Sequence, residues 1–136
     1  MTTLNNILQQ YLQILYRQND ILKQINQALT RQQDLIQSEK WNELNLLLSE
    51  INDLIELRER LGDQSEEFKE DIVKILGIER FDKQIVDRIP NSSLFSILTE
   101  INNMRSNLEN GKQITYDNVD MLQAKIDSNK GLLGTV

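Results

Sequence analysis

The chain has 136 residues, with one proline, five glycines and neither histidine nor cysteine. This length fits a single domain with one core. The absence of histidine and cysteine removes the commonest general base, the thiolate nucleophile and the usual soft metal ligands. The formal net charge is −6 and no face offers clustered lysine and arginine, so neither nucleic acid nor an anionic membrane surface is an expected partner.

Residues 3–37 are predicted to form one long helix, about 50 Å in length at 1.5 Å per residue. Three rows of residues recur every seven positions along it. They are a first row of Ile7, Ile14, Ile21, Ala28 and Leu35, a second of Leu8, Leu15, Leu22, Leu29 and Ile36, and a third of Leu4, Tyr11, Gln18, Ile25 and Gln32. An apolar face this wide requires partner helices along its length. We expect later helices of the same chain to cover it.

Two polar residues, Gln18 and Gln32, interrupt the third row. Polar residues at core positions of packed helices lower stability, and one of their known uses is to fix the register between helices. The alternative is that both glutamines lie at the edge of the face, within reach of solvent. The sequence leaves these two interpretations open.

A second helix is predicted over residues 39–61, with Ser38 as its N-cap and Glu39 in its first turn. Gly62 is expected to end it, because glycine adopts the left-handed conformation at a helix C-terminus without steric cost. Apolar residues at helical spacing give this helix one buried face; they are Leu44, Leu47, Leu48, Ile51, Leu54, Ile55 and Leu61.

A short helical region is predicted over residues 63–89. Asp63 and Glu66 have the spacing of a capping box, and Gly77 is expected to stop the helix that follows. A further helical piece fits Asp82 to Arg88, and Pro90 prevents a helix from continuing through this point.

The last helix is predicted over residues 92–128 and opens at Asn91-Ser92-Ser93. Asn110-Gly111 lies in its middle, where a glycine costs about 1 kcal/mol relative to alanine. We expect a helix that is continuous through this pair but weakened by it. The tail, residues 129–136, contains Gly131 and Gly134 and is expected to fray.

These elements predict an all-α fold: an elongated antiparallel bundle of about three long helices with short helical pieces between the second and the last. Residues 1–136 would form one domain. No segment approaches the roughly 20 apolar residues that a membrane-spanning helix needs, and the first residues lack the features of an export signal. We therefore expect a cytoplasmic protein that does not insert into a membrane.

No arrangement typical of an active site is found. The densest acidic cluster, formed by Glu66, Glu67, Glu70 and Asp71, alternates with lysines on the expected outer face, which indicates solvated surface carboxylates. Glycine-rich phosphate loops, calcium loops and nucleophile elbows are not present. The sequence thus predicts a protein that is not an enzyme, with no catalytic residue, no metal site and no cofactor.

Several features of the chain form one pattern. They are the Leu-rich and Gln-rich first helix, the run from Leu35 through Lys40 to Leu44, the segment from Leu47-Leu48 through Leu54 and Arg58 to Leu61, the Leu76-Gly77 stop and a long last helix with Asn107, Asn110 and Asn118. This pattern resembles that of the FlgN family of flagellar export chaperones. The resemblance implies a cytosolic all-α chaperone of the hook-filament junction proteins, the first and third hook-associated proteins, which it escorts to the components of the type III export apparatus.

In that family the last helical region is amphipathic and is associated with cargo binding. Carried onto this chain, the resemblance implies a cargo-binding face made of Leu108, Ile114, Val119, Met121, Leu122 and Ile126. An amphipathic helical segment of the cargo would lie along this face. The alternative is a self-associating helical hairpin, a structural or adaptor protein whose heptad face pairs with a second copy and which carries no export cargo.

Overall fold

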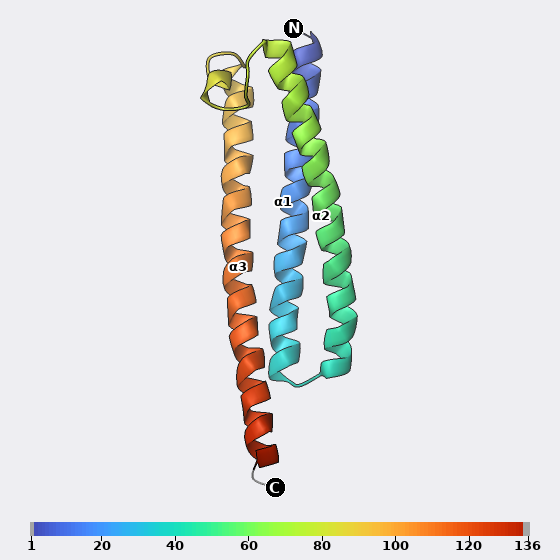
Figure 1. Ribbon diagram of the computed structural model, residues 1–136. Helices are drawn as coiled ribbons and strands as arrows, with labels where there is room; N and C mark the ends of the chain where they lie inside the picture. The colour runs from blue at the N-terminus through green and yellow to red at the C-terminus, as the bar shows by residue number, and fades with distance from the viewer. Residues whose placement is uncertain (1, 135–136) are drawn as a thin grey trace.

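The chain folds into three long helices joined by one tight turn and one longer loop. The computed structural model describes residues 2–134. Helix α1 covers Thr2–Gln37, α2 covers Trp41–Leu76 and α3 covers Asn91–Gly134, and a single 3-10 turn, η1, covers Lys83–Ile85. Figure 1 shows α1 between the other two helices, with α2 antiparallel to it and α3 parallel to it. The predicted all-α helical bundle is confirmed.

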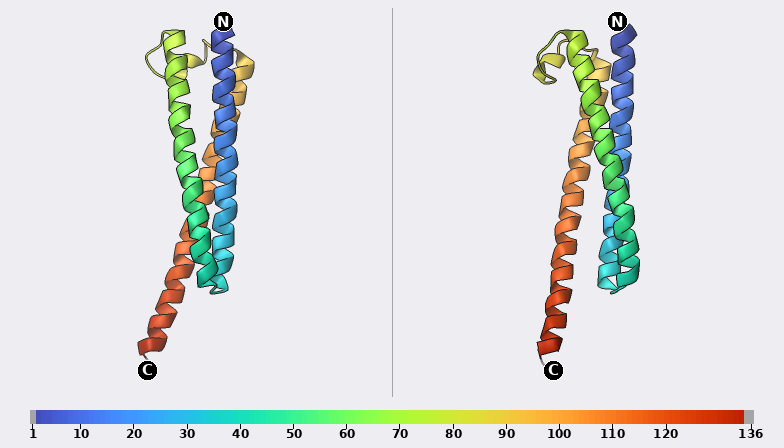
Figure 2. Two further views of the ribbon diagram at one scale, coloured as in Figure 1. Left: turned by 90° about the vertical axis from the view of Figure 1, so that its right-hand side faces the viewer. Right: turned by 45° about the vertical axis from the view of Figure 1, so that its right-hand side comes forward.

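Helix α1 is the centre of the bundle. Both α2 and α3 pack along it, whereas α2 and α3 make almost no direct contact with each other. We call the end formed by residues 77–90 the loop end and the end formed by residues 38–40 the turn end. Figure 2 shows α3 diverging from the α1–α2 hairpin toward the turn end and continuing past it. None of the described helices combines the length and apolarity needed to cross a bilayer.

The predicted end of the second helix at Gly62 is wrong, because α2 continues without interruption to Leu76. Leu61 and Ser65 on either side of this glycine are buried. Burying a large aliphatic side chain such as Leu61 contributes about 1.5–3 kcal/mol, more than the roughly 1 kcal/mol that a glycine costs within a helix. The capping-box spacing at Asp63 and Glu66 is therefore not used, and residues 63–76 belong to α2.

The predicted stop at Gly77 is confirmed. Gly77 has φ of +67°, the left-handed conformation, and its amide donates to the carbonyl of Lys74 at 3.3 Å while that of Ile78 donates to Val73 at 3.2 Å. This double pattern is a Schellman motif. The helical piece expected at Asp82 to Arg88 is reduced to η1.

The turn between α1 and α2 also differs from prediction at Ser38. Ser38 still donates its amide to Asp34 at 3.0 Å, and Lys40 donates to Leu35 at 2.9 Å, with Glu39 between them at φ of +58°. Ser38 therefore belongs to the C-terminal motif of α1 and is not an N-cap. Lys40 takes the N-cap position of α2 without a side-chain hydrogen bond.

The last helix begins at Asn91, next to its predicted start, and passes through Asn110-Gly111 without a break, as expected. The helix extends to Gly134, six residues beyond the predicted end at 128, and the expected fraying of residues 129–136 stays a prediction. The helix can extend this far because no proline interrupts this stretch, and a glycine lowers helix stability without preventing a helix. Residues 135 and 136 lie outside the described part.

Among the described residues, the apolar core divides into three clusters, and α3 contributes to one of them. At the loop end all three helices and the loop meet in one cluster, whose buried members are Leu4, Leu8, Tyr11, Leu12, Leu15, Ile72, Ile85, Ile89 and Ile97. The second and third clusters lie further along the α1–α2 hairpin and contain residues of α1 and α2 alone. Apolar core packing therefore holds α3 at its N-terminal end.

Tyr11 lies at the centre of the loop-end cluster and is fully buried. Its ring meets that of Phe81 edge to face, with 5.5 Å between the ring centroids. Among the described residues its hydroxyl has no hydrogen-bond partner. Burial raises the pKa of Tyr11 to about 12, and the neighbouring Ser65 side chain offsets this effect only in part.

The raised pKa predicts a loss of stability in alkali. Below pH 10 the Tyr11 phenol is protonated in both the folded and the unfolded chain. Between pH 10 and about 12 the unfolded chain loses the proton first, which favours unfolding by about 2–3 kcal/mol in total. Denaturant titrations across this range should show the wild type losing that much more stability than Tyr11→Phe. Parallel pH profiles for the two proteins would contradict the assignment.

Candidate functional site: the groove between α2 and α3

From Glu100 to Asn118, hydrogen bonds of side-chain amides link α3 to α1. Asn19 donates from Nδ2 to the backbone oxygen of Glu100 at 3.1 Å and to its Oε2 at 2.6 Å, and it accepts at Oδ1 from Asn107 Nδ2 at 3.3 Å. Asn26 donates to the backbone oxygen of Asn107 at 2.9 Å. Near the turn end, Asn118 donates to the backbone oxygen of Leu29 at 2.8 Å and to Gln32 Oε1 at 2.9 Å. We call this set the amide ladder.

The amide ladder settles the role of one of the two polar residues in the third heptad row. Gln32 accepts a hydrogen bond from the facing helix, as the register interpretation requires. Gln32 is half-buried. Gln18 is buried and so does not lie at a solvated edge, but its Oε1 has no partner within the described residues. Each neutral hydrogen bond contributes only about 0.5–1.5 kcal/mol net, so the ladder fixes register more than it adds stability.

Gly111 allows α3 to approach α1 at the middle of the ladder. A Cβ atom at this position would lie 2.5 Å from Asn26 Oδ1, whereas a Cβ atom at Gly62 would meet nothing within 4 Å. The glycine that weakens α3 is thus the residue that allows Asn26 to reach Asn107.

These two glycines give a matched pair of substitutions. Gly62→Ala is expected to stabilise the protein by about 0.5–1 kcal/mol, because it improves helix propensity and meets open space. Gly111→Ala should bring no such gain, because the added methyl displaces Asn26 and breaks its hydrogen bond, which offsets the propensity term. Chemical denaturation measures both variants. An equal gain in the two would show that the close approach at Gly111 has no energetic weight.

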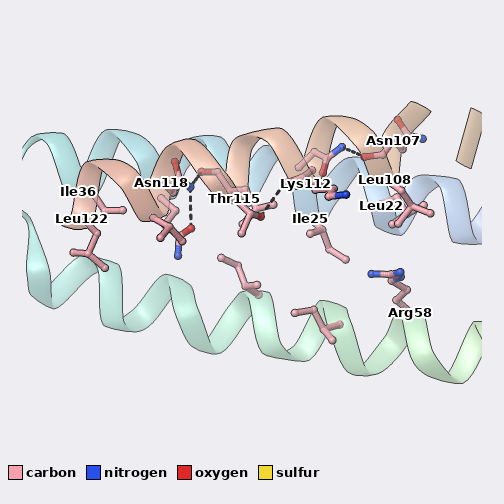
Figure 3. Close-up of a pocket in the computed structure, with 17 residues that line it drawn as sticks. Leu22, Ile25, Ile36, Arg58, Asn107, Leu108, Lys112, Thr115, Asn118 and Leu122 are labelled. Atoms are coloured by element: carbon pink, nitrogen blue, oxygen red, sulfur yellow. Dashed lines mark hydrogen bonds between the residues drawn. The ribbon is translucent and has the colours of Figure 1, made fainter. Parts of the chain in front are cut away.

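A groove runs along α1 between α2 and α3, from the middle of the bundle toward the turn end. Its volume is about 510 Å³. Figure 3 shows α2 on one side and α1 with α3 on the other, with side chains of all three helices pointing into the space between them. Its lining comprises Leu22, Ile25, Asn26, Leu29, Gln32 and Ile36 of α1, Ile51, Ile55 and Arg58 of α2, and Asn107, Leu108, Gly111, Lys112, Thr115, Asn118, Val119 and Leu122 of α3.

The floor and walls of the groove are mainly aliphatic. The second heptad row of α1 supplies Leu22, Leu29 and Ile36 to the floor. On the walls, Ile55 is 37% exposed and Val119 is 57% exposed, which is unusually open for residues between packed helices. The prediction that later helices cover the heptad face is confirmed for both rows: the first packs against α2, and in the second only Leu29 is more than 4% exposed. The exposed apolar surface of the groove therefore belongs to its walls and not to its floor.

The six residues expected to bind cargo divide between two faces of α3. Leu108, Val119 and Leu122 line the groove. Ile126 lies one turn beyond Leu122, is 40% exposed, and continues the same stripe toward the turn end. Ile114 and Met121 lie instead on the stripe of Gly111 and Asn118, which faces α1, and both are half-buried.

Sequence reasoning missed the α2 wall of the groove. Two adjacent stripes run along α2: one contains Leu47, Leu54 and Leu61, and the other contains Leu48, Ile51 and Ile55. A face with both stripes is wider than one neighbouring helix covers. The width of the apolar face of α2 was therefore the feature of the sequence that indicated a second apolar surface, one that α1 does not cover.

The carboxylates of Glu66, Glu67, Glu70 and Asp71 are all exposed on α2, which confirms that they lie on the outer face.

Comparison with known proteins gives no relative for the chain, because no family model, no curated protein and no solved structure matches it. The function is therefore inferred from the groove and from the pattern of the sequence.

Proposed function

We propose that the protein is a cytosolic flagellar export chaperone, a binding protein and not an enzyme. It would bind an amphipathic helical segment of the hook-filament junction proteins and deliver them to the type III export apparatus. The observation that carries the proposal is the open aliphatic groove between α2 and α3. The resemblance of the sequence pattern to the FlgN family supplies the identity of the cargo.

The groove has the properties that a helix-binding site needs. It is elongated, its floor is apolar, and its two walls belong to α2 and α3, which lie apart along the groove (Figure 3). One further helix could therefore pack against all three helices. Each large aliphatic side chain newly buried contributes about 1.5–3 kcal/mol before ordering costs. Four to six such contacts give an affinity that holds a disordered cargo segment and still permits release.

Co-expression tests the proposal. The full chain carrying an affinity tag is produced together with each of the first and third hook-associated proteins, and complexes are isolated from the soluble fraction. The proposal expects at least one of the two to co-purify in a stable complex. If neither does, the chaperone assignment is wrong.

The alternative of a self-associating adaptor is favoured by the same exposed groove, since a second copy could cover it. Light scattering on the purified chain distinguishes the two functions. A monomer that forms a complex with a junction protein supports the chaperone. A tight dimer whose mass does not change on dilution, and which binds no junction protein, supports the adaptor.

A further inference from the structure

The charge around the groove is opposite to that of the chain as a whole. The protein carries a formal net charge of −6, yet the residues lining the groove include the cations Arg58 and Lys112 and no aspartate or glutamate. Lys112 Nζ lies 5.9 Å from the ring centroid of Tyr116, so an aromatic face within the chain already attracts this ammonium group. Arg58 has no such neighbour in the described contacts.

Arg58 occupies a position that would otherwise be aliphatic. Its spacing from Ile51 and Ile55 continues their stripe along α2, and Figure 3 shows its guanidinium pointing from α2 into the groove, toward Leu22 and Leu108. The ion pairs found among the described residues are Arg31–Glu50, Lys69–Glu66 and Lys125–Glu39. Arg58 is exposed, so within the described part of the chain it presents a hydrated guanidinium without an ion-pair partner beside an apolar surface.

A second polar group lies beside Arg58. A cavity of about 370 Å³ adjoins this end of the groove and shares four of its lining residues, Leu22, Ile55, Arg58 and Leu108. Gln18, which is 93% buried, also lines it, with the unpartnered Oε1 described above. Glu59 lies at the edge of this cavity next to Arg58 in the chain, without forming an ion pair with it. At this end of the groove a guanidinium and an unpartnered amide oxygen thus lie beside the aliphatic side chains of Leu22, Ile55 and Leu108.

From this arrangement we infer that the occupant of the groove is an amphipathic helix with a carboxylate at one end of its apolar stripe, and that this carboxylate pairs with Arg58. The inference rests on the proposed function, in that the groove takes a helix. Leu108 and Leu122 lie about 21 Å apart along α3 at 1.5 Å per residue, so the contacting stripe spans about four turns. Complementary charge selects this occupant over a purely aliphatic helix.

The pairing would set both specificity and direction. A guanidinium binds a carboxylate through two parallel N–H···O bonds, and the surrounding Leu22, Ile55 and Leu108 would exclude water from them. A helix without the acid leaves the Arg58 guanidinium desolvated and unpaired, which penalises the wrong partner. Arg58 lies at one end of the groove. The position of the carboxylate along the partner helix therefore determines in which direction that helix lies in the groove.

Four synthetic peptides test this inference against the full-length protein. Each is an 18-residue amphipathic helix with leucine along one stripe. One peptide carries Glu at the first position of the stripe and another carries Glu at the last position. The other two peptides are identical to these except that Gln replaces the Glu. Fluorescence anisotropy gives Kd for each. We expect one Glu peptide to bind about tenfold more tightly than its Gln twin, and 0.5 M NaCl to reduce this advantage.

Two α2 variants complete the experiment. Arg58→Gln should abolish the advantage of the Glu peptide, whereas Arg60→Gln, two residues away on the outer face, should retain it. Equal Kd values for Glu and Gln twins, or an advantage that survives Arg58→Gln, would overturn the inference. Failure of all four peptides to bind would also overturn the inference. So would a dimer of the free protein that the Arg58→Gln substitution dissociates, because the occupant of the groove would then be a second copy of the chain.

These outcomes are distinct from those of the proposed function. If the peptides show the Arg58-dependent preference but no junction protein co-purifies, the inference stands and the cargo assignment fails. If a junction protein co-purifies but the Glu and Gln peptides bind equally, the chaperone assignment stands and the inference fails.

Discussion

Replacing Ile97 by alanine is expected to destabilise the protein by about 3–4 kcal/mol, within the usual range for truncating a buried isoleucine. Ile97 is 1% exposed and is the α3 member of the buried loop-end cluster. Truncation would leave a cavity facing α1, α2 and the loop, because all three contribute to that cluster. Denaturant unfolding monitored by circular dichroism measures the change.

Leu98 provides the matched control for this prediction. It is the next residue of α3, has the same number of side-chain carbons, and is 47% exposed. Leu98→Ala should cost less than about 1 kcal/mol. Comparable losses for Ile97→Ala and Leu98→Ala would mean that α3 is not anchored at the loop end in the way the core clusters indicate.

Placing two aspartates in the groove should abolish cargo binding. In the variant with both Val119→Asp and Leu122→Asp, two carboxylates would lose hydration when a cargo helix covers them, a cost of several kcal/mol. Affinity is expected to fall at least about 100-fold, so that the junction protein no longer co-purifies. Val119 is 57% exposed in the free protein, and its replacement should leave the fold intact.

The control for the groove variant lies on the outer face of α3. Asn110 and Ala124 are both exposed, and neither of them lines the groove. The variant with Asn110→Asp and Ala124→Asp adds the same charge to the same helix away from the groove, and it should retain the complex. If both variants lose the cargo, or neither does, binding does not depend on the groove.

The sequence predicted most of the fold because heptad rows report directly which residues must be buried together. The first heptad row of α1 packs against α2, and Gly77 and Pro90 end and begin helices as their backbone preferences require. Gly62 misled the prediction because helix propensity is a local term of about 1 kcal/mol. The buried stripe through Leu61 outweighs it, and that stripe becomes evident only when α1 is in place.

The site was only partly predictable, and the reason is geometric. Periodicity shows that Leu108, Val119 and Leu122 share a face, but it does not show whether a neighbouring helix covers that face. Whether α3 approaches α1 closely depends on Asn26 fitting against Gly111, a contact between residues 85 positions apart. The sequence signal at Asn110-Gly111 indicated a weak helix, and the structure shows that it also marks a close approach.

Helix α3 is anchored by the apolar cluster at the loop end and is held mainly by amide hydrogen bonds along the groove, the region where we propose that a partner binds. Native-state hydrogen exchange on the free protein tests this most directly. Replacing apolar packing by a few amide bonds lowers the local opening free energy by about 3 kcal/mol. Backbone amides of residues 105–126 should therefore exchange about 100-fold faster than those of residues 8–25 in α1. Equal protection of the two segments would contradict the account.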